Sequence, residues 1–182
     1  MQRLLVMTII GDDRPGLVES VASLVAEHSG NWLESRMSRL GGHFAGILRV
    51  EVPAECESAL VSGLKGLSSR GLNVVIHPDK PPAETKDGAR LVRLEIIGQD
   101  RPGIVSQISR ALAAYGVNVE ELQTECASAA MSGETMFVAR ARLKIPEKSD
   151  AAGLRQTLEK IATDLIVEIS FGEVVEPAGK LG

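Results

Sequence analysis

The residues best suited to chemistry lie in one short motif that the chain contains twice. The first copy, Gly11-Asp12-Asp13-Arg14-Pro15-Gly16-Leu17-Val18, recurs as Gly98-Gln99-Asp100-Arg101-Pro102-Gly103-Ile104-Val105. Each copy offers a carboxylate that can accept hydrogen bonds from an ammonium group and a guanidinium that can hold a carboxylate. If a helix follows, its first N–H groups provide a second binding position for an anion. This combination suits a small zwitterion.

An asparagine follows each copy at the same offset from the motif. Its amide can hydrogen-bond a ligand that lies against the next strand, or it can serve only the turn after a helix-ending glycine. The candidate ligand-binding residues are therefore Asp12, Asp13, Arg14, Pro15, Gly16, Asn31, Asp100, Arg101, Pro102, Gly103 and Asn118.

A purely structural role explains the same residue types. Aspartate is favoured at helix starts, where its carboxylate accepts a hydrogen bond from an early helical N–H, so the motif aspartates can be helix caps. The arginines can equally be solvated turn residues. Proline and glycine serve the backbone shape under either interpretation. The residues alone leave both interpretations open.

Each motif lies between a strand and a helix. Leu5, Met7 and Ile9 alternate before the first copy, which predicts a strand with one buried face. After it, Leu17 and Val21 begin a spacing typical of a helix with one apolar stripe. We expect proline in the first helical turn, where its missing N–H costs nothing.

Each half continues in the same order of elements. The first half predicts a helix ending near Gly30, a hairpin turning at Gly41-Gly42, a third strand closed by Pro53, a second helix and a last strand. The order strand, helix, strand, strand, helix, strand predicts an α+β fold of two ferredoxin-like domains. Each domain is then a four-stranded antiparallel sheet with two helices on one face.

Two stretches depart from this pattern, and the first of them separates the expected domains. A proline-rich stretch between the halves has no periodicity, which is typical of a linker. The second hairpin turn, around Ala127 to Thr135, is longer than the first. The predicted divisions are a first domain at 1–77, a linker at 78–89, a second domain at 90–173 and a flexible tail at 174–182.

Composition excludes several classes of function. A net charge of −4 without a basic cluster argues against direct binding of nucleic acid. The chain has no apolar run of membrane-spanning length and no secretory leader after Met1, so we expect a cytoplasmic protein. Cys56 and Cys126 are isolated, and the histidines lack ligand or catalytic spacing. We therefore expect no metal, no cofactor and no catalytic residue.

The two repeats, each with a Gly-x-Asp-Arg-Pro-Gly-[Leu/Ile]-Val turn and an asparagine opening the second strand, resemble the ACT domain. The resemblance covers nearly the whole chain and implies a regulatory module that commonly binds amino acids. The free-standing pair of repeats and the run Glu34-Ser-Arg-Met-Ser-Arg-Leu-Gly-Gly-His-Phe44 are similar to the repressors that control transcription of the glycine cleavage system. Gln99, in place of Asp12, departs from strict equivalence of the two copies.

This resemblance implies a non-enzymatic regulator that senses a small amino acid, with glycine as one candidate. Because the chain is acidic, it would repress transcription by contacting a protein partner such as a DNA-binding transcription factor. The alternative is an ACT subunit that controls a metabolic enzyme in trans, or an enzyme that acts on a small metabolite. Both alternatives remain open at this point.

The expected pocket lies where the turn of one half meets the second strand of the other half or of a neighbouring chain. A single turn is too shallow to bury a small zwitterion on several sides. Edge strands that are not blunted tend to pair. We therefore also expect chains to associate as homo-oligomers.

Overall fold

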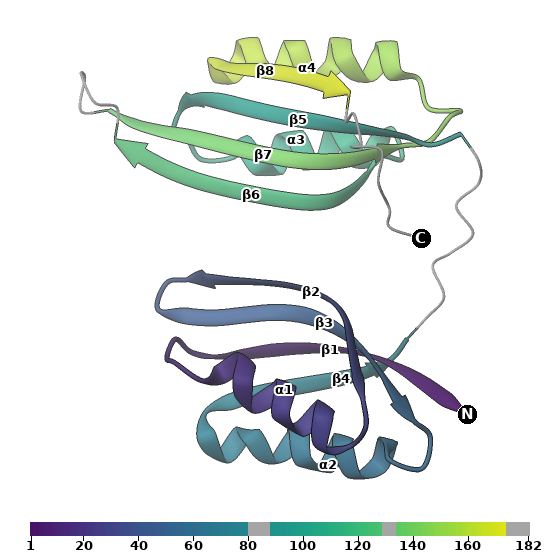
Figure 1. The fold of residues 1–182 in the computed structure, drawn as a ribbon. Helices are drawn as coiled ribbons and strands as arrows, with labels where there is room; N and C mark the ends of the chain where they lie inside the picture. Colours follow the sequence, from purple (N-terminus) through teal and green to yellow (C-terminus); the bar gives the residue numbers. More distant parts are fainter. Residues whose placement is uncertain (80–87, 129–133, 174–182) are drawn as a thin grey trace. The chain divides into compact units, whose positions relative to one another are not determined.

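The computed structural model describes residues 1–79, 88–128 and 134–173. The chain divides into two compact units, Met1–Ala83 and Glu84–Gly182 (Figure 1). The middle of the expected linker, part of the second hairpin turn and the expected tail lie outside the described residues.

The first unit is a four-stranded antiparallel sheet with both helices on one face (Figure 1). The strand order is β2-β3-β1-β4, so the first and third strands are central. Its elements are β1 (Gln2–Asp12), α1 (Leu17–Glu27), β2 (Asn31–Leu40), β3 (His43–Pro53), α2 (Glu57–Gly66), the short 3-10 helix η1 (Leu67–Arg70) and β4 (Leu72–Pro78).

The second unit repeats this topology with the strand order β6-β7-β5-β8. The α+β, ferredoxin-like architecture predicted for each half is therefore confirmed. Its elements are β5 (Arg90–Gln99), α3 (Ile104–Ala114), β6 (Asn118–Ser128), β7 (Thr135–Ile145), α4 (Ala151–Leu165) and β8 (Val167–Glu173).

Each unit has its own hydrophobic core between the sheet and its helices. Met7 and Ile9 of β1 are 0% and 1% exposed, while Ile10, which points to the other face of the sheet, is 50% exposed. Val21 of α1 closes the core from the helix side at 0% exposure. The alternation read from the sequence therefore assigns the buried face of β1 correctly.

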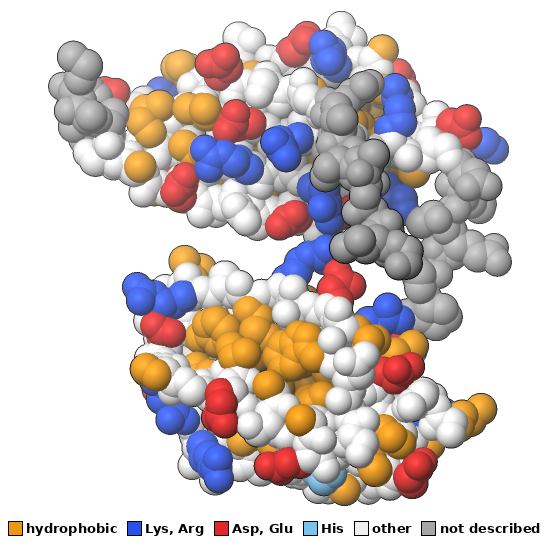
Figure 2. Space-filling model, in the orientation of Figure 1, with side chains coloured by type: hydrophobic (Ala, Val, Ile, Leu, Met, Phe, Trp, Pro, Cys, Tyr) orange, Lys and Arg blue, Asp and Glu red, His pale blue; other side chains and the backbone are white. Residues whose placement is uncertain are grey.

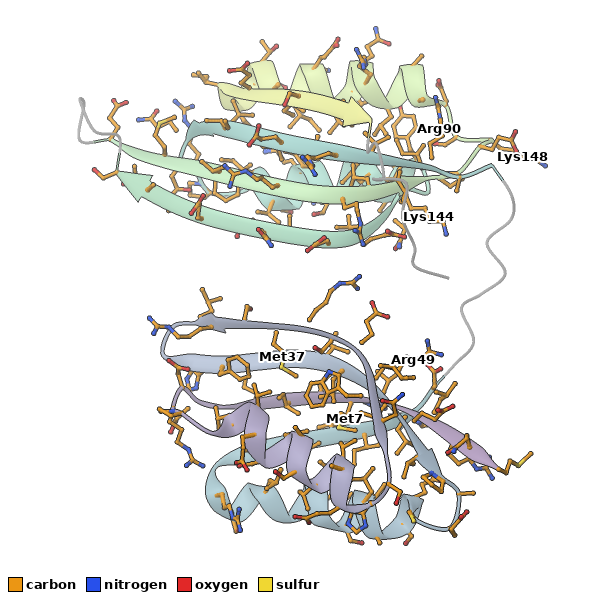
Figure 3. All side chains as sticks on the ribbon, viewed as in Figure 1. Met7, Met37, Arg49, Arg90, Lys144 and Lys148 are labelled. Carbon is orange, nitrogen blue, oxygen red and sulfur yellow. The ribbon has the colours of Figure 1, made fainter. Side chains whose placement is uncertain are left out.

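The core side of β2 is only partly covered. Trp32 and Met37 of β2 are half-buried, as is Phe44 at the start of β3, and all three pack against the core of the first unit. Figure 2 shows hydrophobic side chains gathered on the face of this unit beside α1, and Figure 3 labels Met37 and the buried Met7.

The second strand of each unit, β2 or β6, has an irregularity at the same place. The pairing register shifts between Trp32 and Glu34 in β2, and between Val119 and Glu121 in β6. A bulge adds one residue and increases the local twist of a strand. The two repeats therefore match in detail as well as in topology.

The residue after β4 is held against the first sheet. The Asp79 backbone N–H donates to the Leu4 carbonyl at 3.1 Å. Arg49 of β3, labelled in Figure 3, donates from Nε to Asp79 Oδ2 at 3.0 Å. The Asp79 side chain is only 12% exposed, so this contact is a partly buried ion pair.

Within the described ranges, no helix has the length and apolar character that a bilayer crossing requires.

Candidate functional site

Each motif forms a tight turn between a strand and a helix. Gly16 has φ 90° and ψ 1°, and Gly103 has φ 97° and ψ −4°. These angles are those of the third residue of a type II turn, a position that favours glycine, with proline favoured just before it. The helices begin at Leu17 and Ile104, directly after these glycines.

This geometry corrects the expectation for the prolines. Gly16 and Gly103 are the N-cap residues, so Pro15 and Pro102 precede the cap and are not in the first helical turn. The turn type explains the difference, because proline supplies the fixed φ of the second turn residue. The sequence pattern Pro-Gly is thus a turn signal before it is a helix signal.

The motif aspartates do not cap the helices. An N-cap glycine has no side chain to accept from the first helical N–H groups, and neither helix has a side-chain cap. Instead, the Asp13 N–H donates to the Gly42 carbonyl and the Asp100 N–H donates to the Thr135 carbonyl, both at 2.9 Å. The turn is therefore fixed to the following hairpin through its backbone, and the capping alternative is wrong.

The carboxylates of the first turn have nitrogen-bearing side chains as neighbours. Arg39 Nη1 lies 3.3 Å from Asp13 Oδ2, and His43 Nδ1 lies 3.3 Å from Asp12 Oδ1. Arg14 donates to the Arg70 carbonyl at the end of η1. The first turn thus joins the β2–β3 hairpin to η1, and its negative charge is partly neutralised within the unit.

The second turn has a different electrostatic environment. The strand registers pair Arg39 with Phe44 and Cys126 with Phe137, so Cys126 occupies the position equivalent to Arg39. By the same registers Met136 replaces His43.

Two side chains without charge, Cys126 and Met136, therefore replace Arg39 and His43. Among the described residues no group pairs with the Asp100 carboxylate, which is exposed. Arg101 Nη2 donates to Gln99 Oε1 at 3.1 Å. The second turn therefore presents a less neutralised acceptor for an ammonium group than the first.

The first glycine of each motif has a structural role that the sequence interpretation missed. A Cβ on Gly11 would lie 2.5 Å from the Gly71 carbonyl oxygen, and a Cβ on Gly98 would lie 2.6 Å from Val167 Cγ1. Glycine is needed here because the neighbouring strand begins in direct contact with the backbone. An isolated glycine at the same place in both strands is the signal that could have revealed this contact.

The two asparagines do not lie beside the turn of their own unit. Asn31 pairs with Glu51, which pairs with Leu4, so Asn31 lies at the opposite end of β1 from the motif. Asn118 is placed in the same way through Lys144 and Leu91. At about 3.3 Å per strand residue the two ends are roughly 25 Å apart. One unit alone therefore does not bring its asparagine and its turn together.

The turns are open to solvent. Asp12, Asp13 and Asp100 are all exposed. In the second unit an apolar cleft lies between α3 and strands β6 and β7, but its volume of about 30 Å³ is too small for an amino acid. Each turn alone therefore offers polar contacts from one side.

Other charges of the second unit are paired on the open face of its sheet. Arg140 of β7 donates to Glu95 at 2.9 Å and to Glu125 at 3.3 Å. The hydrogen bond with Glu95, followed by that with Glu125, raises the pKa of the Arg140 guanidinium. In the described part of the chain, no three His, Cys, Asp or Glu residues group so that they could hold a metal ion.

Comparison with known families identifies the domain that the chain contains twice. The ACT domain matches residues 3–76 and 91–172. Together these ranges cover most of the chain, so the protein belongs to the ACT domain family and contains two ACT domains. The resemblance inferred from the repeated turn is confirmed.

Among named proteins, the chain is similar to the glycine cleavage system transcriptional repressor of Escherichia coli strain K12. The two are 24% identical over 175 residues, which cover 95% of this chain and 91% of the repressor. The expected resemblance to this repressor group is confirmed over almost the full length.

Two solved structures share the fold. An unknown protein from Galdieria sulphuraria is 29% identical, with a TM-score of 0.81 over 96% of this chain and 100% of that protein. A protein provisionally named glycine cleavage system transcriptional repressor is 18% identical, with a TM-score of 0.68 over 96% of this chain and 98% of that protein. Both cover the two repeats, so the tandem arrangement extends beyond this chain.

Proposed function

We propose that this chain is a non-enzymatic regulator that binds a small amino acid at its Gly-x-Asp-Arg-Pro-Gly turns and acts through a protein partner. The observation that carries the proposal is the left-handed glycine cap, which leaves the first helical N–H groups without a side-chain acceptor beside an exposed aspartate. This pairing of donors and acceptor fits the two charged ends of an amino acid.

The ligand carboxylate would accept hydrogen bonds from the first N–H groups of α1 or α3, which have no partner within the helix. Its ammonium group would donate to Asp13 or Asp100. Arg14 and Arg101 border the same turn as candidate ligand contacts, and Pro15-Gly16 and Pro102-Gly103 set its shape. Asp12 is a further acceptor in the first turn.

The asparagines enter this proposal through a second copy of the chain. Asn31 and Asn118 open the edge strands β2 and β6, and an edge strand can pair with another chain. An asparagine supplied in this way would cover the open side of a turn. In the proposal, homo-oligomer formation and ligand binding are therefore coupled.

The second turn should bind more tightly than the first. At Asp13 an ammonium group competes with the Arg39 guanidinium 3.3 Å away, whereas Cys126 replaces that arginine near Asp100. We expect Asp100→Ala to weaken binding more than Asp13→Ala. If the bound ligand and a covering second chain bury this charged hydrogen bond, its removal costs about 1.5–3 kcal/mol.

Calorimetric titration with glycine, serine and alanine tests this assignment on wild type and the two aspartate variants. Because neither aspartate caps a helix, the variants should lose affinity with at most a small drop in melting temperature, which for Asp13→Ala comes from the lost ion pair with Arg39. A lower melting temperature with unchanged affinity would assign the aspartates to structure alone. Absence of saturable binding at millimolar concentration would refute amino-acid sensing.

The proposal of repression through a partner is supported by the negative net charge of the chain and by its similarity to the glycine cleavage system transcriptional repressor. A net charge of −4 disfavours the phosphate backbone of DNA, so the chain needs a DNA-binding protein to reach a promoter. Tight, salt-sensitive gel-shift binding of promoter DNA by the purified chain alone would contradict this. Co-purification from the native host separates the alternatives: a transcription factor supports repression, and a metabolic enzyme supports regulation in trans.

A further inference from the structure

A pocket of about 150 Å³ lies in the second unit, away from its turn. It occupies the corner where β5 begins, β7 ends, α4 begins and β8 ends. The turn follows the other end of β5, roughly 30 Å away at about 3.3 Å per residue. The lining residues are Arg90, Val92, Ile145, Ala151, Leu154, Arg155, Phe171 and Gly172.

The pocket combines an apolar floor with two cations. Leu154 and Ile145 are 1% and 4% exposed, so they belong to the core beneath it. Arg155 Cζ lies 5.9 Å from the centroid of the Phe171 ring. An arginine placed over the face of a ring still has N–H groups that can donate to an anion. Arg90, labelled in Figure 3, starts β5 on the other side.

The same corner of the first unit lacks this charge. The registers make Arg3 equivalent to Arg90, since Arg3 pairs with Val52 and Arg90 with Ile145. Arg3 Nε lies 3.7 Å from Oε2 of Glu57, the first residue of α2.

The corresponding first residue of α4 is Ala151, which carries no charge. One turn further along, Arg155 replaces Val61. Compared with the first unit, this corner of the second unit therefore has one carboxylate fewer and one guanidinium more.

Neither pocket arginine has a carboxylate partner among the described residues. In the described part of the second unit, the arginines that form ion pairs are Arg140 and Arg142. Their partners are Glu95, Glu120, Glu121 and Glu125. The pocket lining contains no acidic residue. Two guanidinium groups therefore border one hollow with an apolar floor, and no carboxylate among the described residues pairs with either of them.

We propose that this corner binds a small organic acid that carries one carboxylate on an apolar body. The guanidinium groups would hold the carboxylate, and Phe171 with the aliphatic floor would contact the body. A zwitterion fits less well because the lining offers no carboxylate for an ammonium group. This site is separate from the proposed amino-acid turns and does not depend on them.

Phenylacetate is a suitable probe, and phenylacetamide is its neutral control of the same shape. Calorimetric titration of the full chain should give saturable phenylacetate binding that is at least roughly tenfold tighter than phenylacetamide binding. Ala151→Glu restores the acid of the first unit, and Arg155→Val restores its valine. Each variant should weaken phenylacetate binding by roughly tenfold or more.

Arg110→Val is the matched control, because Arg110 is an exposed arginine of α3 outside the pocket. It should bind phenylacetate like wild type. Circular dichroism melts confirm that each variant is folded, and Ala151→Glu should melt no lower than wild type. Equal binding of the amide, unchanged binding by both pocket variants, or no saturable binding at millimolar phenylacetate would overturn the proposal.

Discussion

Replacing Gly11 by alanine should destabilise the first unit through a direct backbone collision. The new Cβ would lie 2.5 Å from the Gly71 carbonyl oxygen and 3.3 Å from Leu72 Cδ1. The oxygen belongs to the backbone next to β4, so it cannot swing away as a flexible side chain would. Overpacking of this kind costs about 1–3 kcal/mol, and we expect a value in the upper half of that range.

Gly66→Ala is the matched control, because no atom lies within 4 Å of a Cβ built there. Gly66 ends α2 with an ordinary helical φ of −62°, so alanine is compatible with its backbone. A compatible glycine-to-alanine change stabilises by about 0.4–1 kcal/mol. The two variants should therefore move stability in opposite directions.

Urea unfolding followed by tryptophan fluorescence measures both variants. Trp32 is the single tryptophan of the chain and packs against the first core, so its signal reports the first unit. Gly11→Ala should lower the midpoint at unchanged slope, and a loss of about 2 kcal/mol corresponds to roughly 8–16 °C in melting temperature. A Gly11→Ala midpoint equal to that of Gly66→Ala would refute the close-contact argument.

Four further substitutions test separate parts of the account. Gly16→Ala places a side chain at φ 90° in open space, so thermal melts should show only the left-handed backbone cost of about 1–2 kcal/mol. Leu60→Ala, at a residue that is 0% exposed, should cost about 2–5 kcal/mol in urea unfolding through the cavity it leaves. Asp150 caps α4 by accepting from the Gly153 N–H at 2.9 Å, so Asp150→Ala should cost about 0.5–2 kcal/mol in a circular dichroism melt. Asp13→Ala removes only an exposed ion pair and should cost about 1 kcal/mol or less in the same assay.

The architecture could be predicted from the sequence because its signals repeat. Alternating apolar residues such as Leu5, Met7 and Ile9 fix the buried face of a strand, and the second copy of the motif confirms the element order. The turn was located correctly for the same reason. Its detailed geometry was not, because Pro-Gly is compatible with a first helical turn and with a type II turn until φ is known.

Other features of the site depend on pairing between distant strands. The neutralisation of Asp13 by Arg39 and its absence near Asp100 follow from strand register, which the motif itself does not contain. The position of Asn31 at the far end of its sheet also follows from register. The corner between Arg90 and Arg155 brings residues far apart in the chain together, and only the fold reveals it.

Chemical-shift mapping of the ¹⁵N-labelled chain during a glycine titration tests the central claim most directly. The account predicts saturable shifts at the amides that begin the two helices, Leu17 to Glu19 and Ile104 to Ser106, with the second set saturating at lower glycine concentration. Phenylacetate should leave these amides unchanged and shift those around Arg155. Glycine shifts confined to other regions, or no shifts at millimolar glycine, would contradict binding at the turns.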